Sequence, residues 1–382
     1  MTTADDLSPL RRAEFAEAVL KLEELMTQCG RAFLIGAGCS KCAGLPLTAE
    51  LTEKVLGSTT LDAKAKDVLN ELKSLFEGTT DANIEDYLSE LIDLLAIAER
   101  RAIRGAKEKE VDLNGKKVSA DQLREAVEQI KCAITEVIDC NINIEIHRDF
   151  IRAVHRPLRP GKVNNNQIVD YLILNYDTLL EDTLAIERVP FADGLDGGVT
   201  GWWSFPTFRR EGLAARVLKL HGSINWCEFQ DDPLPRRVAK RLSIKPTDNC
   251  RILIWPASTK YRETQRDPYA QLVELAREVL RPKIGSHQVL LVCGYRFSDA
   301  HINIEIDNAL RESEGRLTVV IFTDADKLMG QIKTWNEDMS ISEQVLIFSK
   351  RGFFHGTHAE ISPVDLPWWK FENLARLLGG ER

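Results

Sequence analysis

Four short apolar runs in the sequence each end in small or polar residues that could bind a ligand or move a proton. FLIGAGCS (33–40) ends in glycines and a serine, and YLILNYDTLLE (171–181) carries an amide and a carboxylate. VLKLHGSINW (217–226) adds a histidine, and VLLVCGYRFSDAHI (289–302) adds a serine and an aspartate. Ligands of open parallel sheets bind outside the carboxyl ends of the strands, so these four runs predict one shared crevice.

The first turn has the residue types of a phosphate-binding loop. Gly36, Ala37 and Gly38 follow a strand and precede a helix, where small residues let backbone N–H groups approach a pyrophosphate. The full dinucleotide fingerprint needs a third small residue where this chain has Lys41, and an acid after a second strand, where helical segments come instead. This departure argues against an ordinary Rossmann dehydrogenase. A tight strand-to-helix turn without a ligand is the alternative.

The second and third runs supply the groups that could act on a sugar. Asn175 and Asp177 are suited to ribose hydroxyls, although Asp177 and Thr178 are also common where helices begin, so capping is the alternative for both. His221 is followed by Gly222 and has an unperturbed pKa that suits a general base near neutrality. A single histidine is more often structural, but the shared position at a strand end favours function for Asn175 and His221.

The fourth run could hold the adenosine half of a dinucleotide. Gly294 follows the strand, and Ser298 and Asp299 precede a helix that begins near His301. Capping of that helix is an equal alternative for Ser298 and Asp299, and His301 is expected to pack or hydrogen-bond locally. The other histidines are expected on the surface or in packing roles: His147, His155, His287, His355 and His358.

The pattern of the elements predicts an α/β fold, a Rossmann-like doubly wound parallel sheet with an inserted helical subdomain. Residues 1–30 form an N-terminal helix, 31–350 the sheet domain, and 351–382 a C-terminal packing segment in which Trp368 and Trp369 are core or oligomer contacts and 367–378 is a surface helix. The helical insertion is expected at about 61–158, with an exposed loop or short hairpin around Asn114-Gly115. Strands are expected at 31–36, 170–174, 217–220, 252–255, 288–293, 317–322 and 345–348.

Composition limits the partners. The 382 residues carry a formal net charge of −8, so no basic footprint for nucleic acid is present. Neither a signal-peptide profile nor an apolar run of roughly 20 residues occurs, which predicts a cytoplasmic protein without membrane contact. The eight cysteines are expected to be reduced and mostly buried. Only Cys39 and Cys42 have a C-x-x-C spacing, without a second pair for zinc, so no metal is expected.

Taken as a set, GAGCS, LNYDTLLE, LHGSINW and GYRFSDAHI resemble the bacterial sirtuin-like domain family, in the branch found in antiphage defence, over residues 31 to about 312. The resemblance implies an NAD+ glycohydrolase that cleaves the bond between nicotinamide and ribose, with NAD+ as substrate and no metal. It also implies that a helix at 84–91 covers the site. The matching positions imply a phosphate site of Ala37, Gly38 and Ser40, a nicotinamide-ribose site of Asn175 and Asp177, a base at His221, and Ser298 and Asp299 near the adenosine ribose.

Two other functions remain open. The protein deacylases resemble this chain in the glycine turn, the asparagine and the histidine, but they add a four-cysteine zinc ribbon that this sequence does not contain. A non-catalytic module that senses NAD or ADP-ribose is the third hypothesis. The family also implies an NAD-depleting effector that is gated, and we expect a homo-oligomer. Some relatives act with a separately encoded HerA-type DNA-translocating ATPase, which would have to be another chain because no GxxxxGK[ST] loop is present here.

Overall fold

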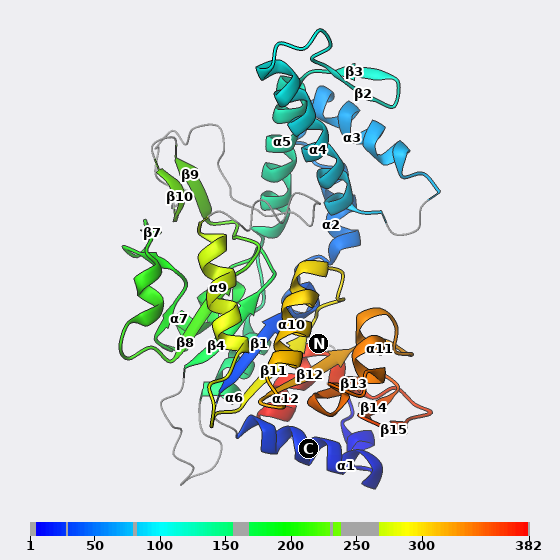
Figure 1. Cartoon of the computed structure of the whole chain (residues 1–382), viewed down its shortest axis with the longest axis vertical. Helices are drawn as coiled ribbons and strands as arrows, with labels where there is room; N and C mark the ends of the chain where they lie inside the picture. The colour runs from blue at the N-terminus through cyan, green and yellow to red at the C-terminus, as the bar shows by residue number, and fades with distance from the viewer. Residues whose placement is uncertain are drawn as a thin grey trace.

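The computed structural model describes residues 5–27, 30–78, 82–155, 168–229, 232–237 and 267–380. Its centre is a nine-stranded sheet with the order β15-β14-β13-β12-β11-β1-β4-β8-β5 (Figure 1). The strands from β5 to β13 are parallel, and β14 and β15 are antiparallel. The predicted α/β fold with a mostly parallel sheet is confirmed. The strand expected at 252–255, with Cys29 and Cys250, lies outside the described residues.

The order of the strands reverses beside β1, because the chain continues to β4 on one side and returns to β11 on the other. Such a reversal is where open α/β sheets bind their ligands. The strands of the sheet are β1 (Arg31–Ile35), β4 (Val169–Ile173), β5 (Phe191–Ala192), β8 (Ala215–Lys219), β11 (Gln288–Cys293), β12 (Leu317–Thr323), β13 (Val345–Ser349), β14 (Gly352–His355) and β15 (His358–Ile361).

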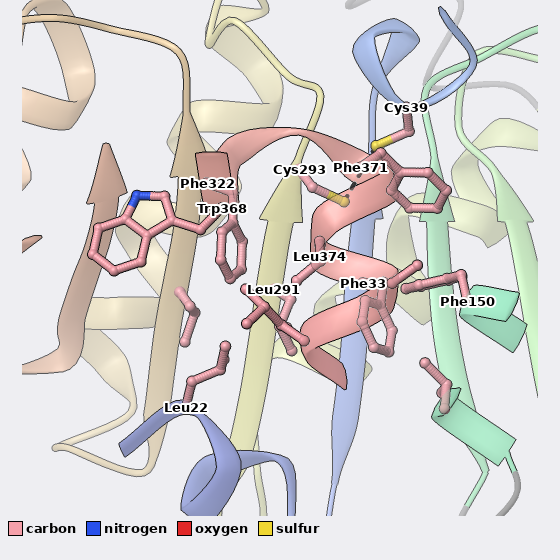
Figure 2. Packing of buried hydrophobic residues seen from close by; sticks show 14 of the residues in the cluster. Leu22, Phe33, Cys39, Phe150, Leu291, Cys293, Phe322, Trp368, Phe371 and Leu374 are labelled. Carbon is pink, nitrogen blue, oxygen red and sulfur yellow. Dashed lines mark hydrogen bonds between the residues drawn. The ribbon is translucent and has the colours of Figure 1, made fainter. Parts of the chain in front are cut away.

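Helices cover both faces of this sheet, which is why its strands read as nearly continuous apolar runs. One face carries Phe33 and Leu291 and packs against α1 (Ala13–Met26), α6 (Glu145–His155), α7 (Leu179–Ile186) and α12 (Phe371–Leu378). Figure 2 shows α12 and Trp368 against this face. The other face carries the alternate residues, such as Leu34, and packs against α9 (Tyr269–Leu280), α10 (Ala300–Glu312) and α11 (Gly330–Glu337).

A separate helical cluster follows the glycine turn and lies at one end of the sheet (Figure 1). It comprises α2 (Thr48–Leu56), α3 (Ala63–Leu75), α4 (Ile84–Ile103) and α5 (Ala120–Ile138), with the hairpin of β2 (Val111–Leu113) and β3 (Lys116–Val118). The hairpin at Asn114-Gly115 is confirmed, and both residues have the positive φ that this turn needs.

The boundaries of the helical cluster differ from the expected 61–158. Val55 of α2 belongs to its core, whereas Phe150 and Val154 of α6 pack on the sheet. Helical periodicity in a sequence marks an apolar face but does not say which element that face covers.

The C-terminal segment is part of the core rather than a surface addition. It supplies β14 and β15 as well as α12. Trp368 is fully buried, lies edge-on to Phe15 and Phe348 at 5.5 and 5.0 Å, and donates its indole N–H to the Ser349 carbonyl at 2.7 Å. The core role expected for Trp368 is therefore confirmed, and the surface helix expected at 367–378 buries Phe371 and Leu374 instead.

Smaller elements complete the described chain. A four-stranded sheet that the sequence did not predict has the order β6 (Leu195–Asp196), β7 (Trp202–Trp203), β10 (Asp232–Arg237) and β9 (Trp226–Phe229). The short 3₁₀ turns are Ser8–Arg11, Ala37–Cys39, Lys41–Ala43, Phe205–Arg209, Ser342–Gln344 and Pro367–Trp369. No described helix has the length and apolar character needed to cross a membrane.

Candidate active site at the carboxyl edge of the sheet

The four motifs follow four adjacent strands, β11, β1, β4 and β8, at their carboxyl ends. This confirms that they converge on one edge of the sheet. Ile173 of β4 pairs with Lys219 of β8, and Asn175 and His221 each lie two residues beyond that pair. The amide and the imidazole therefore leave the sheet at the same level on neighbouring strands.

A hydrogen-bonded network fixes the orientation of Asn175. Its amide nitrogen donates to the Gly36 carbonyl at 3.1 Å and to the Ser40 hydroxyl at 2.8 Å. Ser40 in turn donates to a carboxylate oxygen of Asp177 at 2.8 Å. Asn175 and Ser40 are only 8% and 4% exposed, so the carboxamide has little freedom to rotate. With both donors directed at these partners, its oxygen is the atom that can accept a hydrogen bond from a ligand.

Asp177 also serves the helix that follows it. Its second carboxylate oxygen accepts from the Leu179 N–H at 3.1 Å, while Thr178, at the cap position, makes no side-chain cap and donates to Asp182 at 2.7 Å. The capping alternative therefore holds in part for Asp177, which satisfies a helical N–H and also binds Ser40.

The glycine turns pack against one another. The Gly36 N–H donates to the Cys293 carbonyl and the Gly38 N–H to the Gly294 carbonyl, each at 3.0 Å. A Cβ on Gly36 would lie 2.4 Å from the Gly294 oxygen, so both turns need glycine for this close approach. Ala37 and Gly38 are exposed and are the part of the turn that can face a ligand.

Substitution of Gly294 tests this packing. Gly294 has φ +65°, and an added Cβ would lie 2.4 Å from the Cys39 backbone nitrogen. We expect Gly294→Ala to lower the free energy of unfolding by about 2–3 kcal/mol in urea titrations. Gly285→Ala is the matched control, because Gly285 has φ +83° with nothing within 4 Å of its Cβ position, and should cost only about 1 kcal/mol. Equal losses in the two variants would contradict the close contact between the turns.

Two cysteines lie beneath these turns. Cys39 and Cys293 are each 1% exposed, and the Cys39 thiol donates to the sulfur of Cys293 at 3.3 Å (Figure 2). Burial raises the pKa of the Cys39 thiol well above its usual range, so it stays protonated. The prediction of buried cysteines is confirmed for this pair but not for the other described cysteines, since Cys140 is exposed and three are only partly buried: Cys42, Cys132 and Cys227. The thiol of Cys42, although next in the C-x-x-C spacing, donates to the Cys39 carbonyl instead.

The motifs that follow β8 and β11 contact each other across the ends of β1 and β4. Two strands separate β8 from β11, which puts their ends roughly 14 Å apart at the usual strand spacing. Yet His221 Nε2 lies 3.9 Å from a carboxylate oxygen of Asp299, and the rings of His221 and His301 have centroids 5.6 Å apart. The resemblance implies a place near the adenosine ribose for Asp299, and the sequence suggests local packing for His301. The structure brings both to His221.

The segment before α10 holds Asp299 in this position. The Asp299 N–H donates to the Tyr295 hydroxyl at 3.1 Å, and Tyr295 donates to the Asn303 side chain at 3.0 Å. Asn303 also donates to the carbonyl of Phe297, which has φ +59°. Asp299 is the residue before α10 but makes no side-chain cap, so its carboxylate is directed to His221 rather than to the helix. Ser298 is exposed.

The segment after β8 is attached to the Asn175 segment. Gly222 has φ +82°, which turns the chain after His221. The Ile224 N–H donates to the Tyr176 carbonyl at 2.9 Å, and the Ser223 hydroxyl donates to the same carbonyl at 3.3 Å. Tyr176 and Ile224 also belong to the core of the helical cluster. The core of the helical cluster, which includes residues of the segment at 84–91, is therefore continuous with the segments that follow β4 and β8.

A buried ion pair that the sequence analysis missed lies under this edge. Lys219 is fully buried, donates to the Asp177 carbonyl, and lies 3.4 Å from Glu181. Burial raises the pKa of Glu181 to about 7, and one of its carboxylate oxygens has no hydrogen-bond partner. The single lysine inside the apolar run VLKLHG is the signal that could have identified the pair.

Histidines elsewhere have the packing roles expected of them. His147 contacts the Phe371 ring at 4.8 Å between centroids, and His155 is 2.8 Å from the Tyr171 hydroxyl. Burial lowers the pKa of both to about 4, so they are neutral. Within the described ranges, the group of side chains that could hold a metal ion is His221, Asp299 and His301.

Part of the chain matches the model of a known protein family. Residues 171–342 match the model of the SIR2-like domain, and this segment contains Asn175, His221 and Asp299 with the strands that position them. No curated protein matches the sequence. The matched segment is therefore similar to SIR2-like domains, and the mostly parallel sheet is consistent with a Rossmann-like fold.

Proposed function

We propose that this protein is an NAD+ glycohydrolase that converts NAD+ and water to nicotinamide and ADP-ribose. The observation that carries the proposal is the fixed carboxamide of Asn175, one strand away from His221 at the same level of the sheet edge. The SIR2-like match over this segment adds the NAD-binding character of the family.

The residue types suit the bond that breaks. Nicotinamide leaves NAD+ with the bonding electrons and becomes neutral, and an oxocarbenium-like ribose remains. The carboxylates of Asp177 and Asp299 supply negative potential near that cation. The Asn175 oxygen orients a ribose hydroxyl or the attacking water, and neutral His221 takes the proton that the water loses. General bases of this kind contribute about 10²–10⁴-fold to rate.

The same sheet edge offers candidate contacts for the rest of the substrate. Ala37 and Gly38 are exposed at the turn beside Asn175 and are our candidates for the pyrophosphate contact. Ser40 has an indirect role, because its hydroxyl bridges Asn175 and Asp177 and so holds both side chains in place. Ser298 and Gly294, on the β11 side, are our candidates for the adenosine half.

Product analysis tests the proposal. Purified protein is incubated with NAD+, alone and after co-expression with the product of the adjacent gene, and mass spectrometry identifies the products. Nicotinamide and ADP-ribose in a one-to-one ratio, without any peptide, are expected. Nicotinamide release that requires acyl-lysine peptides and transfers the acyl group would favour deacylation instead. Tight NAD+ binding without release of nicotinamide in either preparation would favour a non-catalytic sensing scaffold.

For the cell, we propose an NAD-depleting effector of antiphage defence, acting in the cytoplasm as a homo-oligomer. The presence of the four motifs, in the order found in the sirtuin-like family of antiphage defence that they resemble, supports this role. We also propose a HerA-type ATPase as partner, which would be a separate chain because the sequence contains no GxxxxGK[ST] loop. Co-purification with that ATPase and a fall in cellular NAD+ after infection are expected. A monomer that does not co-purify with the ATPase would contradict the partnership.

A further inference from the structure

We propose that His221, Asp299 and His301 form a binding site for a divalent transition metal such as zinc, and that the bound metal inhibits the protein. The binding site stands on geometry alone. The inhibition rests on the proposed NAD+ cleavage, because the metal would occupy the imidazole assigned as base.

The three side chains already converge. One ligand atom from each lies within 4.8 Å of the others, and His221 Nε2 is 3.9 Å from the Asp299 carboxylate. In a tetrahedral zinc site with bonds of about 2.0–2.1 Å, the ligand atoms are roughly 3.4 Å apart. Side-chain rotations that move these atoms by about 1 Å would therefore complete the geometry.

The donor set matches a transition metal. Two imidazole nitrogens and one carboxylate oxygen suit zinc and its neighbours, whereas magnesium and calcium prefer oxygen ligands. Three protein ligands leave the fourth position open to water or substrate, as in catalytic zinc sites. The positive N-terminus of α10 opposes a cation, but the Asp299 carboxylate lies at that terminus and offsets it.

The site is held by its surroundings, as metal ligands usually are. The carboxylate of Asp299 is directed to His221 instead of capping α10, and the Tyr295–Asn303 hydrogen bonds fix its backbone. His221 and Asp299 have side chains that are 6% and 11% exposed. Two ligands are therefore largely shielded from solvent, and they come from segments after strands that are not neighbours in the sheet.

A metal ion bound at this site would stop the proposed reaction for two reasons. A nitrogen of His221 that is bonded to a metal cannot accept a proton. A doubly charged cation beside the ribose would also disfavour the oxocarbenium-like sugar. We therefore expect zinc at one equivalent to inhibit nicotinamide release, and a chelator to restore it.

Cobalt(II) binding to the full chain tests the site without relying on activity. Wild type should bind one equivalent and show visible absorption of a tetrahedral site with nitrogen and oxygen ligands, without a thiolate charge-transfer band. His301→Ala should weaken this binding at least 10-fold, while the control His358→Ala, at a histidine whose side chain is 58% exposed, should bind like wild type. Equal thermal unfolding of the three proteins checks their folding. Unchanged cobalt binding by His301→Ala, or a thiolate band, would overturn the site.

Zinc inhibition then separates the two proposals. Wild type and His358→Ala should lose nicotinamide release with zinc, whereas His301→Ala, compared with its own rate without zinc, should need at least 10-fold more zinc for the same inhibition. Cobalt binding without nicotinamide release under any condition would support the metal site and contradict the NAD+ glycohydrolase. Equal inhibition of wild type and His301→Ala would overturn the inhibitory role of this site.

Discussion

Replacing Asn175 with alanine should lower the rate of nicotinamide release from NAD+ by about 10²–10³-fold, the cost of removing one positioned polar group at a reacting centre. The carboxamide is held by Gly36 and Ser40, so its oxygen is already oriented before substrate arrives. Truncation removes that oxygen but leaves the hydrogen bond between Ser40 and Asp177 in place. The loss should therefore appear in kcat/KM rather than in the fold.

His221→Ala should cause a comparable loss, about 10²–10⁴-fold, because the general base is removed. The double variant should be little worse than either single one, since groups that act in one step are not additive. Release of nicotinamide is followed by chromatography at saturating and limiting NAD+. Asn141→Ala, at an exposed asparagine outside the four motifs, is the control and should have wild-type rates. Full activity in both site variants would remove the assignment.

The placement of Asn175 beside His221 was accessible from sequence for a simple reason. Both residues directly follow short apolar runs, and parallel strands end at the same edge of a sheet. The runs also show where β1 and β11 end, so both glycine turns could be placed at this edge, whereas their adjacency depends on a strand order that the sequence analysis did not predict.

The contact between His221 and Asp299 could not be predicted in this way. It depends on two segments that reach toward each other across β1 and β4, and on the Tyr295–Asn303 hydrogen bonds that hold one of them. Sequence shows that Asp299 precedes a helix, which is the usual place for a cap. It does not show that the carboxylate makes no cap to the helix N–H groups and lies next to the His221 imidazole instead.

The helical insertion shows the same limit. The amphipathic pattern of α6 identifies a helix, but only the packing of Phe150 on the sheet separates it from α5, which belongs to the helical cluster. Likewise, Trp368 and α12 enter the core because β14 and β15 extend the sheet ahead of them, and nothing local in 367–378 encodes that.

The largest expected loss of stability concerns the buried pair beneath the site. Lys219 is fully buried and 3.4 Å from Glu181, which has an oxygen without a partner. Removal of one member of a buried ion pair leaves an uncompensated charge, so Lys219→Met should lower the free energy of unfolding by about 3–5 kcal/mol at pH 8. Lys219→Met with Glu181→Gln should recover most of this loss, apart from about 1 kcal/mol for the lost hydrogen bond to the Asp177 carbonyl.

The pH dependence of the free energy of unfolding distinguishes this charge effect from a packing defect. The pKa of Glu181 is about 7 in the folded protein and 4.5 ordinarily, so between these values the unfolded chain has lost a proton that the folded chain keeps. Wild-type stability should therefore fall by about 1.4 kcal/mol per pH unit from this group and level off above pH 7. Without the positive charge of Lys219 the pKa of Glu181 rises further, so Lys219→Met should continue to lose stability through pH 8, whereas the double variant should lack this slope. Urea unfolding from pH 5 to 9 measures all three, and parallel curves for wild type and Lys219→Met would show that Glu181 does not depend on the Lys219 charge.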